Sequence, residues 1–161
     1  MPRRSLQDEL KQSKPFETPA DEALVALMRT AALVRRAIAR RVEPYGISIA
    51  QYNVLRILRG AGPTGLPTLA VRDRLIEEAP GITRVVDKLE DAGHLTRRRA
   101  AGDRRVVHCV ITEQGLRLLA GMDTLVKETA RMITNGLPEE RDQKALVALL
   151  ADVRAGLDEG R

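Results

Sequence analysis

The sequence predicts a mainly α-helical fold with a small β wing, and three observations lead to this class. Apolar residues recur every three or four positions through most of the chain after residue 20, which is the period of amphipathic helices. Two short stretches, 95–99 and 105–111, lose this period and flank a turn that contains Gly102 and Asp103. Glycine and proline divide the helical region into separate segments. Short helices followed by a two-stranded wing, with longer helices on either side, describe a winged helix-turn-helix with flanking dimerisation helices.

The composition restricts the possible classes of function. The chain has 161 residues, 43% hydrophobic content and a net charge of +5, so it can bury a core and carries a basic excess suited to a polyanion. Its aromatic content of 2% is too low for the base-stacking surfaces of RNA- and single-strand-binding modules. The single cysteine, Cys109, excludes a disulfide framework and a multi-cysteine zinc site. No apolar stretch approaches a membrane span or a signal-peptide centre, so a cytoplasmic protein without membrane contact is expected.

Four regions are expected along the chain. Residues 1–19 mix charges and prolines without an apolar period, and they are predicted to form an arm that is extended or ordered by a partner. Residues 20–45 are predicted to form a dimerisation helix, with acidic residues at its start and arginines at its end, as the helix dipole favours. Residues 46–112 are assigned to the winged helix-turn-helix, and residues 113–161 to C-terminal dimerisation helices.

Local signals set the helix boundaries inside the winged region. The helices are predicted over about 49–59, 67–78 and 82–92. Ser48 and Gln51 have the spacing of a capping box before the first of these helices. Pro67 suits the first turn of the second, and Gly93 is a typical residue to end the third.

The C-terminal region is predicted to contain two helices. Thr112 caps a long helix that continues through about Thr134, and Asn135-Gly136 ends it. Pro138 opens the last helix, whose apolar residues are spaced four, three and four apart, a seam of the kind that pairs helices. A chain of this size cannot cover such helices by itself, so a second copy is expected to do so. The predicted dimer residues are Leu24, Leu27, Leu146, Leu150, Val153 and Leu157.

The net charge is concentrated on the predicted wing. Residues 94–108 contain five arginines and one aspartate, a net +4 out of the +5 of the whole chain. Guanidinium groups on a protruding ribbon suit phosphates and a narrow minor groove, and Arg72 on an earlier helix is a further phosphate candidate. The alternative is a solvated hairpin whose charges protect its edges from aggregation. The wing arginines expected to bind DNA are Arg97, Arg98, Arg99, Arg104 and Arg105.

The helix before the wing has the pattern of a recognition helix. Its apolar residues share one side and are expected to pack inward: Ile82, Val85, Val86 and Leu89. A helix in a major groove reads bases mainly from its N-terminal turns. Arg84 is therefore predicted to bind guanine, Thr83 a phosphate or a thymine methyl group, and Lys88 the DNA backbone. Asp87 and Glu90 are repelled by phosphate, so we expect them to orient basic neighbours. An amphipathic surface helix with ordinary charges is the alternative.

Together these residues resemble the MarR family of bacterial transcriptional regulators over roughly residues 20–157. The matching motifs are Gly46-Ile47-Ser48, Thr83-Arg84-x-x-Asp87-x-Leu89-Glu90-x-x-Gly93, Asp103-Arg104-Arg105 and Ile111-Thr112-x-x-Gly115. The sequence departs from the family in having His94 where an apolar residue usually follows the glycine, and in carrying more arginine in the wing than is typical.

The resemblance implies a triangular homodimer whose first and last two helices intertwine. Each recognition helix would lie in a major groove of a pseudo-palindromic DNA operator, with each wing in the flanking minor groove. Arg105 matches the wing arginine of the family, and Asp103 matches the carboxylate that braces it. The implied function is a repressor released by a small aromatic effector bound between the dimer helices and the DNA-binding lobe. The residues predicted to line that effector site, with ordinary core packing as the alternative, are Arg35, Tyr45, Tyr52 and Met122.

Other functions have less support in the sequence. A non-specific architectural nucleic-acid-binding protein with the same basic wing is the alternative to a sequence-specific regulator. No nucleophile–base pair, P-loop, G-x-G-x-x-G motif or metal-ligand quartet is present, so no enzymatic activity, cofactor or metal is expected. Cys109 is expected to be a buried structural thiol, and His94 and His108 alone do not make a metal site.

Overall fold

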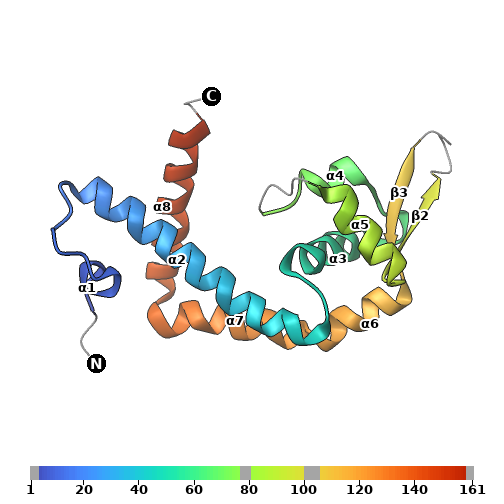
Figure 1. Cartoon of the computed structure of the whole chain (residues 1–161), viewed down its shortest axis with the longest axis horizontal. Coiled ribbons are helices and arrows are strands. Elements are labelled where there is room, and N and C mark those ends of the chain that lie inside the picture. Colours follow the sequence, from blue (N-terminus) through green and yellow to red (C-terminus); the bar gives the residue numbers. More distant parts are fainter. Residues whose placement is uncertain (1–3, 77–80, 100–105, 159–161) are drawn as a thin grey trace. The chain divides into compact units, whose positions relative to one another are not determined.

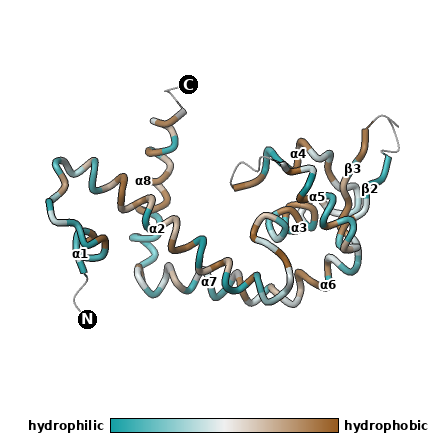
Figure 2. Tube along the Cα trace, viewed as in Figure 1, coloured by the Kyte–Doolittle hydropathy of each residue, from teal (hydrophilic) through white to brown (hydrophobic). Residues whose placement is uncertain are grey.

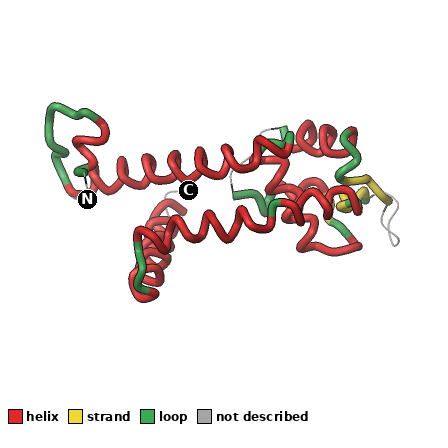
Figure 3. The backbone as a smooth tube through the Cα atoms, turned by 90° about the horizontal axis from the view of Figure 1, so that it is seen from below, coloured by secondary structure: helices red, strands yellow, loops and turns green. Residues whose placement is uncertain are grey.

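The computed structural model describes residues 4–76, 81–99 and 106–158. These residues fall into two compact units, divided between Arg41 and Val42, and each unit is described by itself. The described chain is mainly helical, and its strands belong to the second unit (Figures 1 and 3). No helix within the described ranges combines the length and the apolar character that are needed to cross a membrane.

The first unit begins with a short helix, α1 (Leu6–Leu10). The hydroxyl of Ser5 accepts the backbone N–H of Asp8 at 3.1 Å, and the C-cap residue Lys11, with a φ of 52°, follows the last helical residue. Of the two alternatives predicted for residues 1–19, an extended arm or an arm ordered by a partner, the extended one is therefore wrong over Leu6–Leu10. A side-chain cap allows a single helical turn to form where the sequence has no apolar period to indicate one.

The long helix α2 (Pro19–Val42) has a reciprocal cap at its N-terminus. Thr18 Oγ1 accepts the N–H of Asp21 at 3.2 Å, and the Asp21 carboxylate accepts the N–H of Thr18 at 3.1 Å. Two backbone groups that lack helical partners are thereby satisfied. This cap explains why the helix begins at Pro19, close to the predicted start of the first dimerisation helix.

The second unit contains the helix-turn-helix, formed by α3 (Ile49–Ala61), α4 (Thr68–Arg72) and α5 (Ile82–Asp91). The predicted capping box is present: Ser48 Oγ accepts the N–H of Gln51, and the Gln51 side chain accepts the N–H of Ser48 at 2.9 Å. Helix α4 is shorter than predicted, because the N–H groups of Arg74 and Leu75 bond carbonyls three residues earlier and leave the α-helical pattern. The side chains that pack these helices together and onto the sheet are no more than 2% exposed: Val54, Leu55, Leu58, Val71, Val86, Leu89, Leu95 and Cys109.

The wing is an antiparallel sheet in the order β1-β3-β2, with β1 (Leu66–Pro67), β2 (Leu95–Arg99) and β3 (Val107–Ile111). The predicted pairing of β2 with β3 is confirmed, and the turn predicted between them lies outside the described residues. Strand β1 was not predicted, because two residues that include a proline carry no strand pattern. Its close approach to β3 requires Gly65, which has a φ of 64° and where a Cβ would lie 2.2 Å from the carbonyl oxygen of Cys109.

The C-terminal helices are α6 (Glu113–Gly121), α7 (Asp123–Gly136) and α8 (Glu140–Asp158). The predicted cap at Thr112 is confirmed by its hydroxyl, which accepts the N–H of Gly115 at 3.1 Å. The prediction of a single long helix through Thr134 is wrong, because the helix is interrupted at Met122, between α6 and α7. The Met122 side chain is fully buried, and Tyr45 donates its hydroxyl hydrogen to the Gly121 carbonyl at 2.8 Å. This tertiary contact removes the carbonyl from helical pairing, a cause that the local sequence does not show.

Candidate DNA-binding surface

Helix α5 divides into an apolar face and a polar face that carries the cations Arg84 and Lys88, as predicted, except that Val85, which was expected to pack inward, is half-buried and lines the pocket described below. Ile82, Val86 and Leu89 are at most 6% exposed and hold the helix against the core. Thr83, Arg84 and Lys88 are all exposed on the side away from them. No described side chain caps the start of α5, where Gly81 precedes the helix with a φ of 93°. The first turn therefore presents backbone N–H groups together with the Thr83 hydroxyl and the Arg84 guanidinium.

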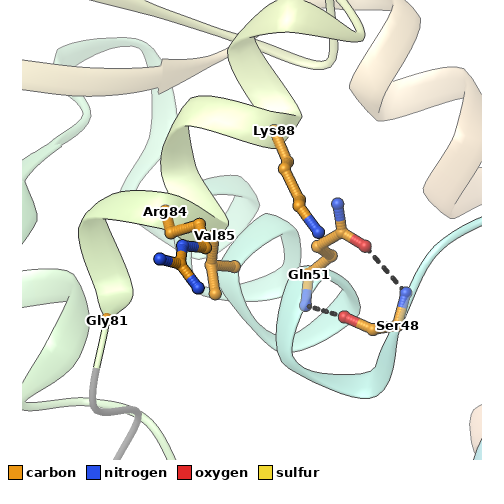
Figure 4. A pocket seen from close by; sticks show the side chains of 6 residues that line it. All are labelled: Ser48, Gln51, Gly81, Arg84, Val85 and Lys88. Atoms are coloured by element: carbon orange, nitrogen blue, oxygen red, sulfur yellow. Dashed lines mark hydrogen bonds between the residues drawn. The ribbon is translucent and has the colours of Figure 1, made fainter.

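The cationic face of α5 borders a pocket at the first turn of α3 (Figure 4). The volume of this pocket is about 220 Å³, smaller than the roughly 300–1,000 Å³ of sites for drug-sized ligands. Arg84 and Lys88 emerge from the same side of α5, and no carboxylate is among the described residues that line the pocket: Ser48, Gln51, Gly81, Arg84, Val85 and Lys88. This arrangement suits an anionic group of the size of a phosphate.

Ser48 and Gln51 are not among the residues predicted to bind DNA, although they line this pocket. Their capping box identified a helix start in the sequence, but it could not show that this helix start lies beside α5. Because each side-chain oxygen accepts the backbone N–H of the other residue, the two residues hold the α3 terminus in place beside Arg84 and Lys88. The sequence indicated that a helix starts at Ser48, but only the folded structure shows that this helix start lies beside α5.

The arginines of β2 differ in their surroundings. Arg98 and Arg99 are exposed near the end of the strand. Arg97 instead lies between two carboxylates of α5, with Nη2 bonded to Asp87 Oδ1 and Nη1 bonded to Glu90 Oε2. The expectation that Asp87 and Glu90 orient a basic neighbour is confirmed by these ion pairs. The hydrogen bond to Asp87 is the main reason that the pKa of Arg97 lies above its ordinary value, while partial burial opposes that increase and the bond to Glu90 adds to it.

The remaining residues predicted to bind DNA lie elsewhere. Arg72 is exposed at the end of α4 and pairs with the neighbouring Asp73 at 3.1 Å. Asp103, Arg104 and Arg105, at the turn of the predicted wing, lie outside the described residues. The structural support for a DNA-binding surface therefore comes from the exposed cations of α5 and β2, namely Arg84, Lys88, Arg98 and Arg99.

The four residues predicted for an effector site have different environments. Tyr52 is 6% exposed in the core of the second unit, and Met122 is fully buried at the break between α6 and α7. Tyr45 is 39% exposed and donates its hydroxyl hydrogen to Gly121. Arg35 lies on the exposed surface of α2, in the first unit. Tyr52 and Met122 thus act as core residues in this structure, and the effector site stays a prediction.

Cys109 is fully buried on β3, with its Sγ 3.5 Å from Thr68 Oγ1. The expectation of a buried structural thiol agrees with this environment, because a thiol without solvent access is a poor redox sensor. His108, on the opposite face of the strand, has Nδ1 2.9 Å from the carbonyl oxygen of Thr64.

Several of the predicted dimer residues expose apolar surface. On α2, Leu24 is 59% exposed and Leu27 is 37% exposed. On α8, Val153 is 46% exposed and Leu157 is 69% exposed, whereas Leu146 and Leu150 are half-buried. Figure 2 shows hydrophobic segments along both α2 and α8. Exposed apolar surface on this scale within one chain is typical of protein interfaces.

Comparison with known proteins identifies the family. Residues 47–107 match the model of the MarR family. The chain is 30% identical over 136 residues to the HTH-type transcriptional regulator PecS of Dickeya dadantii (strain 3937), covering 84% of this chain and 81% of PecS. It is 32% identical to a MarR transcription factor from Planctomyces limnophilus, with a TM-score of 0.63 and coverage of 86% of this chain and 99% of that one.

The fold also matches MepR of S. aureus, solved in complex with DNA, at 19% identity and a TM-score of 0.72, covering 81% of this chain and 96% of that chain. The MarR-type motifs at α5 and at the start of α6, the three-stranded wing and the extent of the match to PecS agree with one another. The chain therefore belongs to the MarR family of transcriptional regulators.

Proposed function

We propose that this protein is a homodimeric transcriptional regulator that binds double-stranded DNA, with α5 in a major groove and the hairpin of β2 and β3 in the flanking minor groove. The observation that carries the proposal is the cationic face of α5, where Arg84 and Lys88 border a pocket that is lined by no described carboxylate. The core fixes the opposite face of the helix, so these cations are held toward the solvent. That a MarR-like fold accommodates DNA is supported by the complex of MepR.

The homodimer is part of this proposal. Apolar residues exposed on α2 and α8 supply surface for a second copy, and two recognition helices related by a twofold axis suit a pseudo-palindromic operator. We further propose that the protein is a repressor released by a small aromatic ligand, as the family resemblance implies. A panel of phenolic carboxylates tested for displacement of bound duplex would identify such a ligand, and displacement by none of them would argue against this class of effector.

A salt series on three labelled nucleic acids tests the proposed function. The duplex from upstream of the protein's own gene is expected to bind about 10³-fold or more tightly than a random duplex or a structured RNA, as sequence-specific regulators do. The logarithm of the affinity should fall linearly with the logarithm of the salt concentration, by about 0.9 for each phosphate neutralised. Fluorescence anisotropy measures both quantities.

Equal affinity for all three nucleic acids would favour the non-specific architectural alternative. Absent binding, or binding that does not respond to salt, would reject both readings of the basic surface.

Substitution of Arg84 tests the assignment of the recognition helix. The Arg84→Ala variant is expected to bind the specific duplex at least about 10- to 100-fold more weakly, because the dimer loses one good base contact in each half-site. It should keep the wild-type stability, because the side chain is exposed. The matched control is Arg141→Ala on α8, whose side chain is 83% exposed and whose loss removes the same charge. Equal losses in anisotropy titrations of the two variants would mean that only net charge matters.

A further inference from the structure

The ion-paired Arg97 connects the wing to the recognition helix at three points. Its guanidinium bonds to the Asp87 and Glu90 carboxylates, and its backbone N–H donates to Glu90 Oε1 at 2.9 Å. The Arg97 side chain is 27% exposed, against 49% for Asp87 and 34% for Glu90. Both nitrogens at the end of the guanidinium are thus engaged, on carboxylates one helical turn apart. A planar guanidinium fixes direction as well as distance when it binds in this way.

The charge at this junction is unfavourable for phosphate. One guanidinium faces two carboxylates, so the cluster of Asp87, Glu90 and Arg97 carries a net charge of −1. A phosphate that approached Arg97 would have to displace a carboxylate already bonded to it and would be repelled by the other. The cluster therefore separates the cations of α5 from Arg98 and Arg99 farther along the wing.

The path of the chain makes this junction important for the position of the wing. After α5 ends, the N–H of His94 bonds the carbonyl of Leu89 at 2.9 Å, and β2 begins directly at Leu95. In the sheet register Arg97 is paired with the fully buried Cys109, and Arg98 is paired with His108 on the other face. Arg97 therefore projects from the inner face of the strand, where it holds β2 beside the middle and the end of α5.

We propose that Arg97 is a positioning residue, which holds the wing at a fixed distance and direction from α5 so that both elements reach their grooves in register. This inference rests on the proposed function of duplex binding. It differs from the simpler prediction, based on the charge of the wing, that Arg97 binds phosphate itself. The two roles predict opposite effects for loss of the Asp87 carboxylate.

The Asp87→Ala variant separates these roles by the sign of its effect. If Arg97 positions the wing, Asp87→Ala and Arg97→Gln should each weaken duplex binding by about tenfold, and the double variant should lose much less than the product of the two, because both remove one interaction. The salt slope should stay at its wild-type value. If Arg97 binds phosphate, Asp87→Ala should tighten binding by removing a repulsive charge. Arg97→Gln should then reduce the slope by about 1.8, which is about 0.9 for each of the two protomers.

The matched control is Arg98→Gln, an equal change of charge at the next residue, on the exposed face of the strand. It is expected to lower the salt slope of duplex binding and to leave the wing in place. Tighter binding by Asp87→Ala together with a reduced slope for Arg97→Gln would overturn the positioning role.

Amide hydrogen exchange without DNA distinguishes failure of this inference from failure of the proposed function. In Arg97→Gln the amides of β2 and β3 should exchange about tenfold faster, while those of α3 keep their protection, because only the junction has lost its bonds. This readout needs no nucleic acid, so it holds even if no duplex is bound. Unchanged exchange in the wing would reject the positioning role, and faster exchange throughout the unit would show a general loss of stability instead.

Discussion

The Val153→Asp variant is expected to be a monomer of 17.8 kDa in solution, at concentrations at which the wild-type protein is a dimer of twice that mass. Val153 is 46% exposed in the single chain, so a carboxylate at this position can stay hydrated when the chain is alone. In the proposed dimer the same carboxylate would be buried without a partner, which is strongly unfavourable. The substitution therefore acts on association and leaves the fold of the protomer intact.

The apolar stripe of α8 makes a large effect reasonable. At about 100° per residue its members cover less than half of the helix circumference, as expected for a face that packs on another surface. The stripe comprises Leu146, Val147, Leu149, Leu150, Val153 and Leu157. A twofold interface contains each substitution twice, and burial of a valine contributes about 1.5–3 kcal/mol, so the pair should cost about 3–6 kcal/mol. The dissociation constant of the dimer should rise at least about 100-fold.

Light scattering after size exclusion measures the mass, and Ala155→Asp is the matched control. Ala155 is exposed on the side of α8 opposite the stripe, and aspartate there lowers helix propensity at least as much. The control should remain dimeric. A dimeric Val153→Asp would move the interface away from this stripe, and two monomeric variants would indicate that the helix itself is disturbed. Leu150→Asp is also expected to give monomers, although its half-buried side chain adds a cost within the protomer.

Much of the second unit could be predicted because its signals are local. The capping residues Ser48 and Thr112 mark helix starts through bonds to residues three positions away. Two features could not be predicted in this way. The interruption between α6 and α7 depends on the hydrogen bond from the Tyr45 hydroxyl to Gly121, and β1 forms because its backbone pairs with β3. Contacts between distant residues override local propensity at both places.

The candidate site shows the same division. The cationic face of α5 follows from helical periodicity, so Thr83, Arg84 and Lys88 could be placed on the exposed side from the sequence. The partner of Asp87 could not be chosen, because five arginines lie nearby in the sequence and only the return of β2 along α5 brings Arg97 to it. Clustered charge indicated where a polyanion would bind, but it did not show which cation is already neutralised by the protein.

Replacement of Gly115 by alanine is expected to reduce the free energy of unfolding by about 3 kcal/mol or more, a large part of the 5–15 kcal/mol typical of a folded protein. A Cβ at this position would lie 2.2 Å from the carbonyl oxygen of His94 and 2.8 Å from Ile111 Cγ1. The carbonyl cannot move freely, since it accepts the N–H of Thr112 at 3.1 Å, and Thr112 Oγ1 donates to the Gly93 carbonyl at 2.7 Å. These bonds connect the end of α5 and the start of β2 to the start of α6. The clash would therefore disturb the segment that connects the recognition helix to the wing.

Gly60→Ala is the matched control, since Gly60 also lies in a helix but a Cβ there meets no atom within 4 Å. Alanine is the better helix former, so this variant should be more stable than the wild type by about 0.5–1 kcal/mol. Urea denaturation at one protomer concentration compares the three proteins, because the stability of a dimer depends on concentration. A Gly115→Ala protein as stable as Gly60→Ala would show that the backbone at His94 yields easily. Close packing would then not explain why the Thr112-x-x-Gly115 motif has a glycine. The expected loss of stability would instead show that the absence of a Cβ at Gly115 allows α6 to begin in contact with the segment that connects α5 to β2.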